Sequence, residues 1–283
     1  MNVALTGATG FIGSHILSAL QEHGHQVTAL VRDEARAEIV EARGAVPAVV
    51  DLHDVPVVAR LLRDADGAIH TASPGDETSA NLDAAVVDAA IEAFAGTGKP
   101  FLEISGVWVY GDNPSISEGS AFNPPALVAW KESIERRVLD ATDMRGVVIV
   151  SGVAYGDGGG GLPGLLLGSP RDELGNLIMP GSGQQRWTTV HVDDIADAFV
   201  RALEDSSARG YYVIGDGLNP TVAELTEAAA VAVGAPGAVP GSDEEARARV
   251  GDYFAEVLLL DQATDAAKAR ADQRIARRSG PQP

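Results

Sequence analysis

The hydrophobic pattern of the chain alternates between short continuous apolar runs and segments with helical spacing. The apolar runs lie at residues 3–5, 27–31, 46–50, 67–72, 101–105 and 146–151. The intervening segments predicted as helices are 12–23, 36–43, 56–62, 79–95 and 127–142. Strands that are buried on both faces give continuous apolar runs, and their alternation with helices is typical of a parallel sheet with helices on both sides. The pattern therefore predicts an α/β fold with a doubly wound parallel Rossmann sheet.

The alternation stops near residue 156, where a segment rich in glycine and proline begins, and resumes at about residue 188. A helix over 195–203 and a strand over 211–214 follow. We therefore expect a smaller C-terminal substrate lobe beside the sheet. The predicted boundaries are 1–155 plus 188–215 for the Rossmann domain, 156–187 plus 216–274 for the substrate-binding lobe, and 275–283 for a tail.

The segment Thr6–Gly13 follows the first apolar run directly and joins it to the first helix. Gly7 permits a tight reversal, Gly10 lets a phosphate approach the backbone, and Gly13 allows close packing of the helix on the strand. The N-terminus of that helix offers free N–H groups to an anion. This arrangement predicts a pyrophosphate site for a dinucleotide, and the alternative is an ordinary structural turn.

Composition narrows the function classes. The formal net charge of −19 over 283 residues argues against nucleic acid and anionic membranes as partners, although solubility alone would explain it. The absence of cysteine excludes disulfides and a thiol nucleophile, and the six histidines show no ligand spacing, so no metal site is predicted. No apolar stretch approaches the roughly 20 residues that span a bilayer, and no secretory signal precedes the first strand, so we expect a cytoplasmic protein.

Several blocks together resemble the extended short-chain dehydrogenases/reductases of the NAD-dependent epimerase/dehydratase type, over Val3 to about Gly234. The blocks are Thr6–Gly13, Asp51-Leu52, His70–Pro74, Asn81, Val109–Asp112 and Val190–Ala196. The resemblance implies that the cofactor is bound by Gly7, Thr9, Gly10, Phe11, Ile12, Asp51, Leu52, Thr71, Ala72, Ser73 and Lys131. It implies a homodimer by family analogy alone.

The predicted cofactor is NADP(H). In NAD-preferring sites an acid near the end of the second strand binds the ribose 2′-hydroxyl. Here that place holds Val31, followed by Arg32. A guanidinium forms charge-assisted hydrogen bonds with a 2′-phosphate, so Arg32 is the expected contact and Arg36 a second one. The alternative is a surface arginine that starts a loop.

The resemblance also implies a Ser/Thr and a Tyr-x-x-x-Lys motif that supply the proton in carbonyl reduction. Lys131 matches the lysine, with Glu135 one turn further on, but Leu127 stands at the tyrosine position. Gly106 occupies the Ser/Thr position, with Ser105 beside it. The catalytic residues predicted here are therefore Lys131 and Ser105, and the usual proton donor is missing.

The favoured hypothesis is an NADPH-dependent ketoreductase of secondary metabolism whose aromatic polyketide substrate supplies its own hydrogen bond through a neighbouring phenol. The pattern resembles atypical ketoreductases of angucyclinones, which likewise depart from the Ser-Tyr-Lys triad. A non-catalytic NADP(H)-binding sensor and a nucleotide-sugar epimerase/dehydratase are the alternatives. Residues expected to contact the small-molecule substrate are Trp108, Tyr110, Trp130, Tyr155 and Arg186, with core packing or a solvated loop as the other interpretation.

Overall fold

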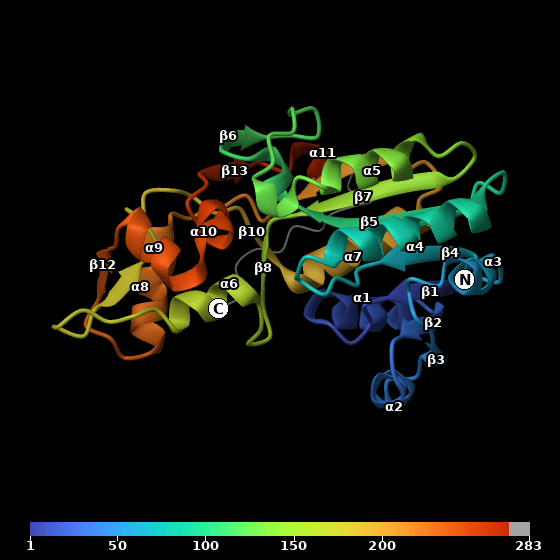
Figure 1. The fold of residues 1–283 in the computed structure, drawn as a ribbon, viewed down its shortest axis with the longest axis horizontal. Helices are drawn as coiled ribbons and strands as arrows, with labels where there is room; N and C mark the ends of the chain where they lie inside the picture. Colours follow the sequence, from blue (N-terminus) through green and yellow to red (C-terminus); the bar gives the residue numbers. More distant parts are fainter. Residues whose placement is uncertain (272–283) are drawn as a thin grey trace.

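The structure is a computed structural model that describes residues 1–271. Its centre is a seven-stranded parallel sheet, seen nearly edge-on at the right of Figure 1. The strands are β1 (Asn2–Thr6), β2 (Gln26–Val31), β3 (Val46–Val49), β4 (Gly67–His70), β5 (Pro100–Gly106), β7 (Arg145–Ser151) and β11 (Gly210–Ile214), in the spatial order β11-β7-β5-β4-β1-β2-β3. The order reverses between β1 and β4, and ligands of such sheets bind at the carboxyl ends of the strands beside this point.

Six helices cover the two faces of the sheet. One face packs against α1 (Phe11–Glu22), α2 (Glu34–Ala42) and α7 (Val192–Glu204), and the other against α3 (Val55–Arg63), α4 (Ser79–Phe94) and α5 (Lys131–Asp140). Successive residues of β1 alternate between these layers: Val3 and Leu5 belong to the first core and Ala4 to the second. The predicted fold class is thus confirmed.

The helix expected over 127–142 is divided. Its first part is a 3₁₀ turn, Ala126–Val128, and α5 begins only at Lys131. Such turns are common at the N-termini of α-helices, because their hydrogen bonds give partners to backbone groups that an α-helix leaves unpaired. Leu127 therefore does not lie one α-helical turn before Lys131 on a continuous helix.

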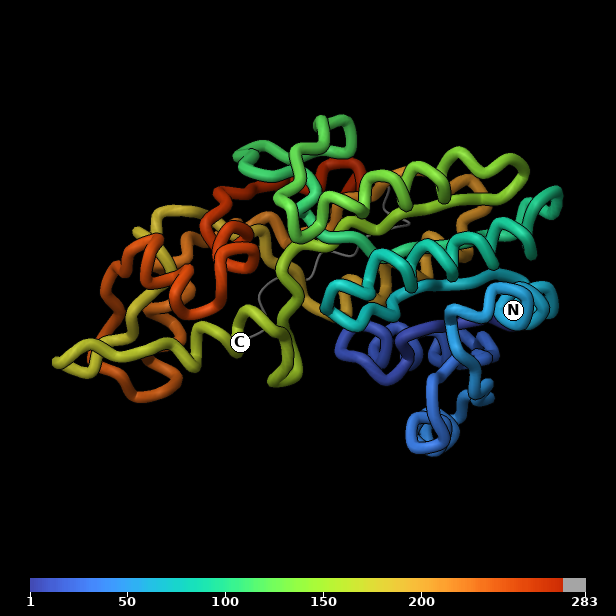
Figure 2. Tube along the Cα trace, viewed as in Figure 1, coloured from blue at the N-terminus to red at the C-terminus, as the bar shows by residue number. Residues whose placement is uncertain are grey.

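A smaller lobe follows the sheet domain and has its own hydrophobic core, which includes Leu166, Met179, Trp187 and Leu258. It contains α6 (Gly161–Leu167), β9 (Leu177–Met179), α8 (Val222–Ala232), β12 (Ala238–Pro240), α9 (Asp243–Val250) and α10 (Asp252–Leu258). The parallel pair β8 (Val153–Tyr155) and β10 (Thr189–His191) joins the lobe to the sheet domain. Figure 2 shows the lobe extending from the carboxyl ends of the strands.

After α10 the chain returns to the sheet domain, although the lobe was predicted to continue to residue 274. Strand β13 (Gln262–Thr264) pairs with β6 (Asn113–Ile116), and α11 (Ala267–Ala271) packs beside β11. The predicted tail, 275–283, lies outside the described residues. Within residues 1–271, no helix is both long and apolar enough to cross a membrane.

Candidate active site

The glycine turn between β1 and α1 has the geometry predicted for it. Gly7 adopts a positive φ of 77°, and a Cβ placed on Gly13 would lie 2.1 Å from the Gly7 carbonyl oxygen. Gly10 is the N-cap residue of α1 and presents no side chain there. The turn can therefore bring a phosphate group against backbone N–H groups at the start of the helix.

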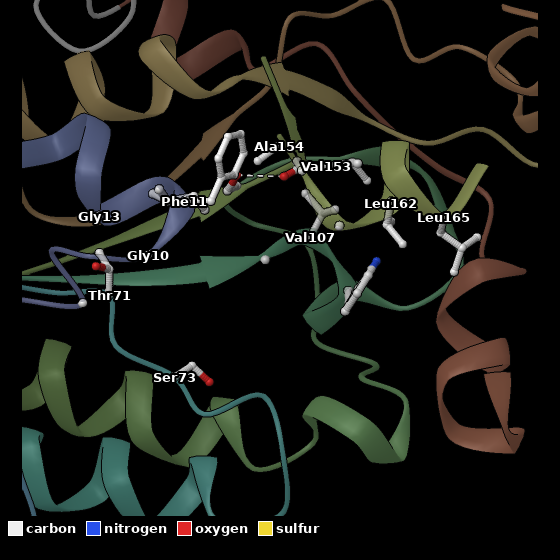
Figure 3. A pocket seen from close by; sticks show the side chains of 18 of the residues that line it. Gly10, Phe11, Gly13, Thr71, Ser73, Val107, Val153, Ala154, Leu162 and Leu165 are labelled. Carbon is white, nitrogen blue, oxygen red and sulfur yellow. Dashed lines mark hydrogen bonds between the residues drawn. The ribbon is translucent and has the colours of Figure 1, made fainter. Parts of the chain in front are cut away.

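A cavity of about 590 Å³ extends from this turn to the lobe, as Figure 3 shows. It is lined by residues 7, 10–13, 71, 73, 106–108, 151–154, 160–162, 165 and 254. Its volume is in the range of cofactor and substrate pockets. The glycine turn lies at one end, and Leu162 and Leu165 of α6 lie at the other. Predicted cofactor residues Gly7, Gly10, Phe11, Ile12, Thr71 and Ser73 contribute to the lining, whereas Thr9 and Ala72 do not.

The segment after β4 is bound tightly to the end of β1. Thr71 Oγ1 donates to the Thr6 carbonyl oxygen at 2.8 Å, and the backbone N–H groups of Thr71 and Ala72 donate to Thr6 Oγ1 at 3.2 and 3.3 Å. The Thr6 hydroxyl also lies 2.7 Å from His70 Nδ1. These bonds fix the floor of the cavity at the point where the strand order reverses.

The residues predicted to bind the adenosine part lie outside the cavity, at the ends of β2 and β3. Arg32 directly follows β2, and its side chain is 69% exposed. Arg36 is held by Asp33, whose carboxylate accepts from the Arg36 guanidinium at 2.6 Å and from its backbone N–H at 2.9 Å. Asp51 is exposed and accepts from the backbone N–H of His53, which lowers the pKa of Asp51. Arg32 Nε also donates to Asp33 Oδ2, but at 3.3 Å, and the Arg32 side chain is the more exposed of the two, 69% against 36%. Arg32 is thus the better placed of the two arginines for an incoming anion.

Lys131 does not line the cavity, because its ammonium group is held inside the protein. Its Nζ donates to Asp83 Oδ2 at 2.6 Å, to Glu103 Oε1 at 2.8 Å and to the Ile104 carbonyl oxygen at 3.0 Å. Three acceptors use all three N–H donors of an ammonium group. Burial opposes the charged form, but the carboxylates of Glu103 and Asp83 outweigh it and raise the pKa of Lys131. A ribose contact, as the family resemblance implies, would require Lys131 to release one of these partners.

Sequence reasoning missed both carboxylates. Asp83 lies on the buried face of the alanine-rich helix α4, and its Oδ1 lies 3.2 Å from His70 Nε2. Burial raises the pKa of Asp83, but His70 and Lys131 together lower it below its ordinary value. Glu103 is fully buried in the middle of the apolar strand β5. An acid within such a strand was the available signal, because an ion is rarely buried without a partner.

Ser105 and Glu135 form a second buried pair. The Ser105 hydroxyl donates to Glu135 Oε1 at 2.5 Å, so Glu135 supports Ser105 rather than Lys131. Glu135 has no exposed surface. Burial, with the nearby charge of Glu103, raises the pKa of Glu135 to about 7. Ser105 is itself buried and does not line the cavity, whose wall is formed by the next residue, Gly106.

Of the five predicted substrate residues, only Trp108 lines this cavity. It packs edge-to-face on Phe254 of α10, with ring centroids 6.1 Å apart. Tyr110 is 1% exposed and packs against Phe122 in the core, and Tyr155 lines a different cavity. Burial raises the pKa of both phenols, which makes them poorer acids.

The other two predicted substrate residues are engaged elsewhere. Trp130 precedes α5, and its ring lies 5.0 Å from Lys131 Nζ. Arg186 forms a bidentate ion pair with Asp261, with N–O distances of 2.8 and 2.6 Å.

The cavity lining contains no ionisable side chain in the described part of the chain. Its three hydroxyl groups already donate to protein atoms: Thr71 to Thr6, Ser73 to Ser79 Oγ at 3.2 Å, and Ser151 to the Gly152 carbonyl oxygen at 2.7 Å. Most of the remaining lining is glycine, aliphatic or aromatic. The site can therefore position a cofactor and a flat apolar molecule, but it offers no residue with the properties of a general acid.

One cluster of metal-ligand types, His15, Asp157 and Asp193, lies at the surface within the described residues. His15 Nδ1 is already 2.8 Å from Asp193 Oδ1, and both carboxylates are largely exposed. An ion pair at the surface explains this arrangement, and we assign no metal to it.

A glycine turn at the reversal point of a parallel sheet, beside a cavity at the carboxyl ends of the strands, defines a Rossmann-type dinucleotide-binding protein. The sequence identifies the family within this class. Residues 3–215 match the NAD dependent epimerase/dehydratase family, and the chain belongs to it.

Relatives and solved structures agree with this assignment. The chain is 31% identical over 276 residues to the epimerase family protein SDR39U1 of Bos taurus, covering 93% of this chain and 90% of the relative. It is 30% identical over 245 residues to a 3-diazoavenalumate denitrifying reductase of a Streptomyces species, covering 76% of each. The structure of human SDR39U1 (isoform 2) with NADPH superposes with a TM-score of 0.71 at 23% identity, covering 96% and 94% of the two chains.

Replacement of Lys131 by methionine should lower the free energy of unfolding by about 3–5 kcal/mol, because it leaves two buried carboxylates without their cation. Urea unfolding of the purified variant measures this loss. Lys99→Met is the matched control, since Lys99 Nζ donates to the backbone carbonyls of Arg63 and Ala65 and pairs with no carboxylate among residues 1–271. Equal stability of the two variants, with NADPH affinity lost only in Lys131→Met, would place the ammonium group at the cofactor instead.

Glu135→Gln should remove a pH-dependent loss of stability that the buried carboxyl group causes. The ordinary pKa of the carboxyl is near 4.5 and its pKa in the folded protein is about 7, so the folded state holds the extra proton between these values. Stability of the unmodified protein should therefore fall as pH rises from about 4.5 to 7, by on the order of 2 kcal/mol.

The free energy of unfolding of Glu135→Gln should lack this fall and exceed that of the parent protein above pH 7. Glu132→Gln, a change on the same helix at a half-buried position that pairs with Arg136, serves as the control. A difference between Glu135→Gln and the parent that stays constant from pH 4.5 to 8 would contradict the raised pKa.

Proposed function

We propose that the protein is an NADPH-dependent reductase that contributes no proton donor and transfers hydride to a flat, largely apolar acceptor. The observation that carries this proposal is the cavity lining, which joins a dinucleotide turn to apolar walls and contains no ionisable group among the described residues. Hydride transfer requires chiefly that the acceptor be held beside the nicotinamide, and a bound nicotinamide cofactor supplies the hydride.

The phosphorylated cofactor is favoured by charge at the end of β2. Arg32 is exposed there and no acid occupies the preceding position, which is Val31. The similarity to human SDR39U1, whose structure contains NADPH, supports the same choice. The residues that would hold the cofactor are the glycine turn at its pyrophosphate, Thr71 and Ser73 beside it, and Arg32 at the 2′-phosphate.

The acceptor we favour is a ketone with a phenol at the ortho or peri position. Addition of hydride to the carbonyl carbon forms a C–H bond and leaves an alkoxide, which needs a proton. The neighbouring phenol already hydrogen-bonds to that oxygen and can transfer its proton, and water then returns a proton to the phenolate. Such a substrate supplies what Leu127 and Gly106 cannot. Hydroxylated aromatic polyketides, angucyclinones among them, have this arrangement.

The walls of the cavity fit this class better than a nucleotide sugar. Trp108, Phe254, Leu162 and Leu165 offer flat and aliphatic surfaces to a fused ring system. A sugar nucleotide would bring a second diphosphate besides that of the cofactor, and arginine is the side chain best suited to bind phosphate away from the glycine turn. No arginine or lysine contributes to this lining in residues 1–271. We therefore place epimerase or dehydratase activity second to reduction within this family.

A second acceptor class is a cationic arene, and the Streptomyces relative named for a diazo compound favours it. Hydride transfer to the terminal nitrogen of an aryldiazonium ion gives a neutral aryldiazene. Loss of N₂ then replaces the C–N bond with a C–H bond, using the hydrogen already delivered. No proton is taken from the protein, so this reaction also suits a lining without acids.

Arg32→Ala should weaken NADPH binding by roughly 10- to 100-fold, the effect of losing one or two charge-assisted hydrogen bonds. NADH binding should hardly change, because NADH has no 2′-phosphate. Titration of the nicotinamide fluorescence measures both constants. Arg43→Ala, an exposed arginine beyond α2, is the control and should change neither constant. An unchanged ratio of NADPH to NADH affinity in Arg32→Ala would reject the 2′-phosphate assignment.

A pair of matched ketones tests the reaction itself. With NADPH, 8-hydroxy-1-tetralone should be reduced at least about 100-fold faster than 8-methoxy-1-tetralone, because only the first carries its own proton donor. Loss of the NADPH absorbance band and analysis of the alcohol product measure the rates.

A benzenediazonium salt tests the cationic class in parallel, with its rate corrected for the reaction with NADPH alone. Tight NADPH binding without turnover of any of the three would favour a non-catalytic sensor.

A further inference from the structure

The lobe contains a second cavity, of about 360 Å³, which other side chains of α6 line. Leu162 and Leu165 line the first cavity, whereas Pro163, Leu166 and Leu167 line the second. Val153 is the one residue that both linings share. The short helix α6 is therefore a wall between two separate spaces.

The walls of the second cavity are almost wholly apolar. Trp187, Leu166, Leu225 and Ala229 form much of them, and Trp187 is only 4% exposed. At the rim, Leu167 is 45% exposed and Leu218 is 70% exposed. A ligand would therefore enter directly from solvent, past apolar side chains, without passing through the cofactor groove.

The polar groups of this cavity gather around one carboxylate. Thr189 Oγ1 donates to Asp216 Oδ2 at 2.7 Å, and the Leu218 backbone N–H donates to Asp216 Oδ1 at 2.8 Å. Burial raises the pKa of Tyr155, and its hydrogen bond to Asp216 and the charge of that carboxylate raise it further. Asp216 forms no salt bridge within the described residues. Because a carboxylate can accept about four hydrogen bonds, Asp216 can accept a further donor.

We propose that this second cavity binds a small ring compound, aromatic or alicyclic, that bears one hydrogen-bond donor such as a hydroxyl or an amine. The rings would occupy the apolar space against Trp187 and Ala229, and the donor would complete the set of hydrogen bonds on Asp216. A space of this size, apolar except for one carboxylate and the two hydroxyls bonded to it, has the usual composition of a small-molecule site. The site is separate from the cofactor groove and does not depend on the proposed reductase activity.

Direct binding tests the site, with 2-naphthol as the probe and the protein saturated with NADPH. Titration calorimetry should show a site that is distinct from any binding in the acceptor space because Ala229→Phe removes it, and tryptophan fluorescence should change because Trp187 lines the cavity. The donor-free analogue 2-methoxynaphthalene should bind roughly 10- to 100-fold more weakly, as expected for the loss of a hydrogen bond to a carboxylate.

Two variants locate the probe. Ala229→Phe fills the cavity and should abolish 2-naphthol binding without changing NADPH affinity, whereas Val231→Phe, on the same helix at an 82% exposed position, should bind as the parent does. Asp216→Asn keeps the bond from the Leu218 N–H and should weaken 2-naphthol by roughly 10-fold, with 2-methoxynaphthalene unaffected. Absence of binding, or equal binding by Ala229→Phe, would overturn the proposal. Because the readout is affinity, neither result depends on turnover.

Discussion

The bonds of the Lys131 ammonium group connect the sheet to two of the three helices that cover one of its faces. Asp83 comes from α4, Glu103 and the Ile104 carbonyl come from β5, and Lys131 itself begins α5. Charges removed from water are stable only when their partners replace the lost hydration, and this ion has acceptors for every N–H. The position of the end of β5, which supplies the cavity wall at 106–108, depends on this connection.

The same connection decides what the site can do. In the pattern that the family resemblance implies, the lysine contacts the cofactor and supports a tyrosine that delivers the proton. Here the lysine is held by buried acids, Leu127 stands at the tyrosine position, and Gly106 stands at the Ser/Thr position. The glycine turn, the floor at Thr71 and the apolar walls are retained. A site with these binding surfaces and no acid among its described lining residues fits the proposed reduction, in which the substrate supplies the proton.

The sequence was sufficient to predict the features that depend on the pattern of neighbouring residues. Continuous apolar runs indicated the parallel sheet, and the spacing of Gly7, Gly10 and Gly13 indicated the turn, because both follow from backbone geometry at neighbouring residues. The polar cluster could not be predicted in the same way, since Asp83, Glu103 and Lys131 meet only after three elements pack together. Tyr110 was expected at the cavity because it follows β5, but the 3₁₀ turn over Val107–Tyr110 directs it into the core.

Helix α6 links the two cavities physically. It is short, is preceded by the glycines at 158–160 and is followed by Gly168. Its position therefore depends mainly on its side-chain contacts. Protein interiors are closely packed, so the side chains of this one helix that line the two spaces share one packing arrangement. Leu162 and Leu165 border the acceptor space, and Leu166 borders the second cavity beside Trp187.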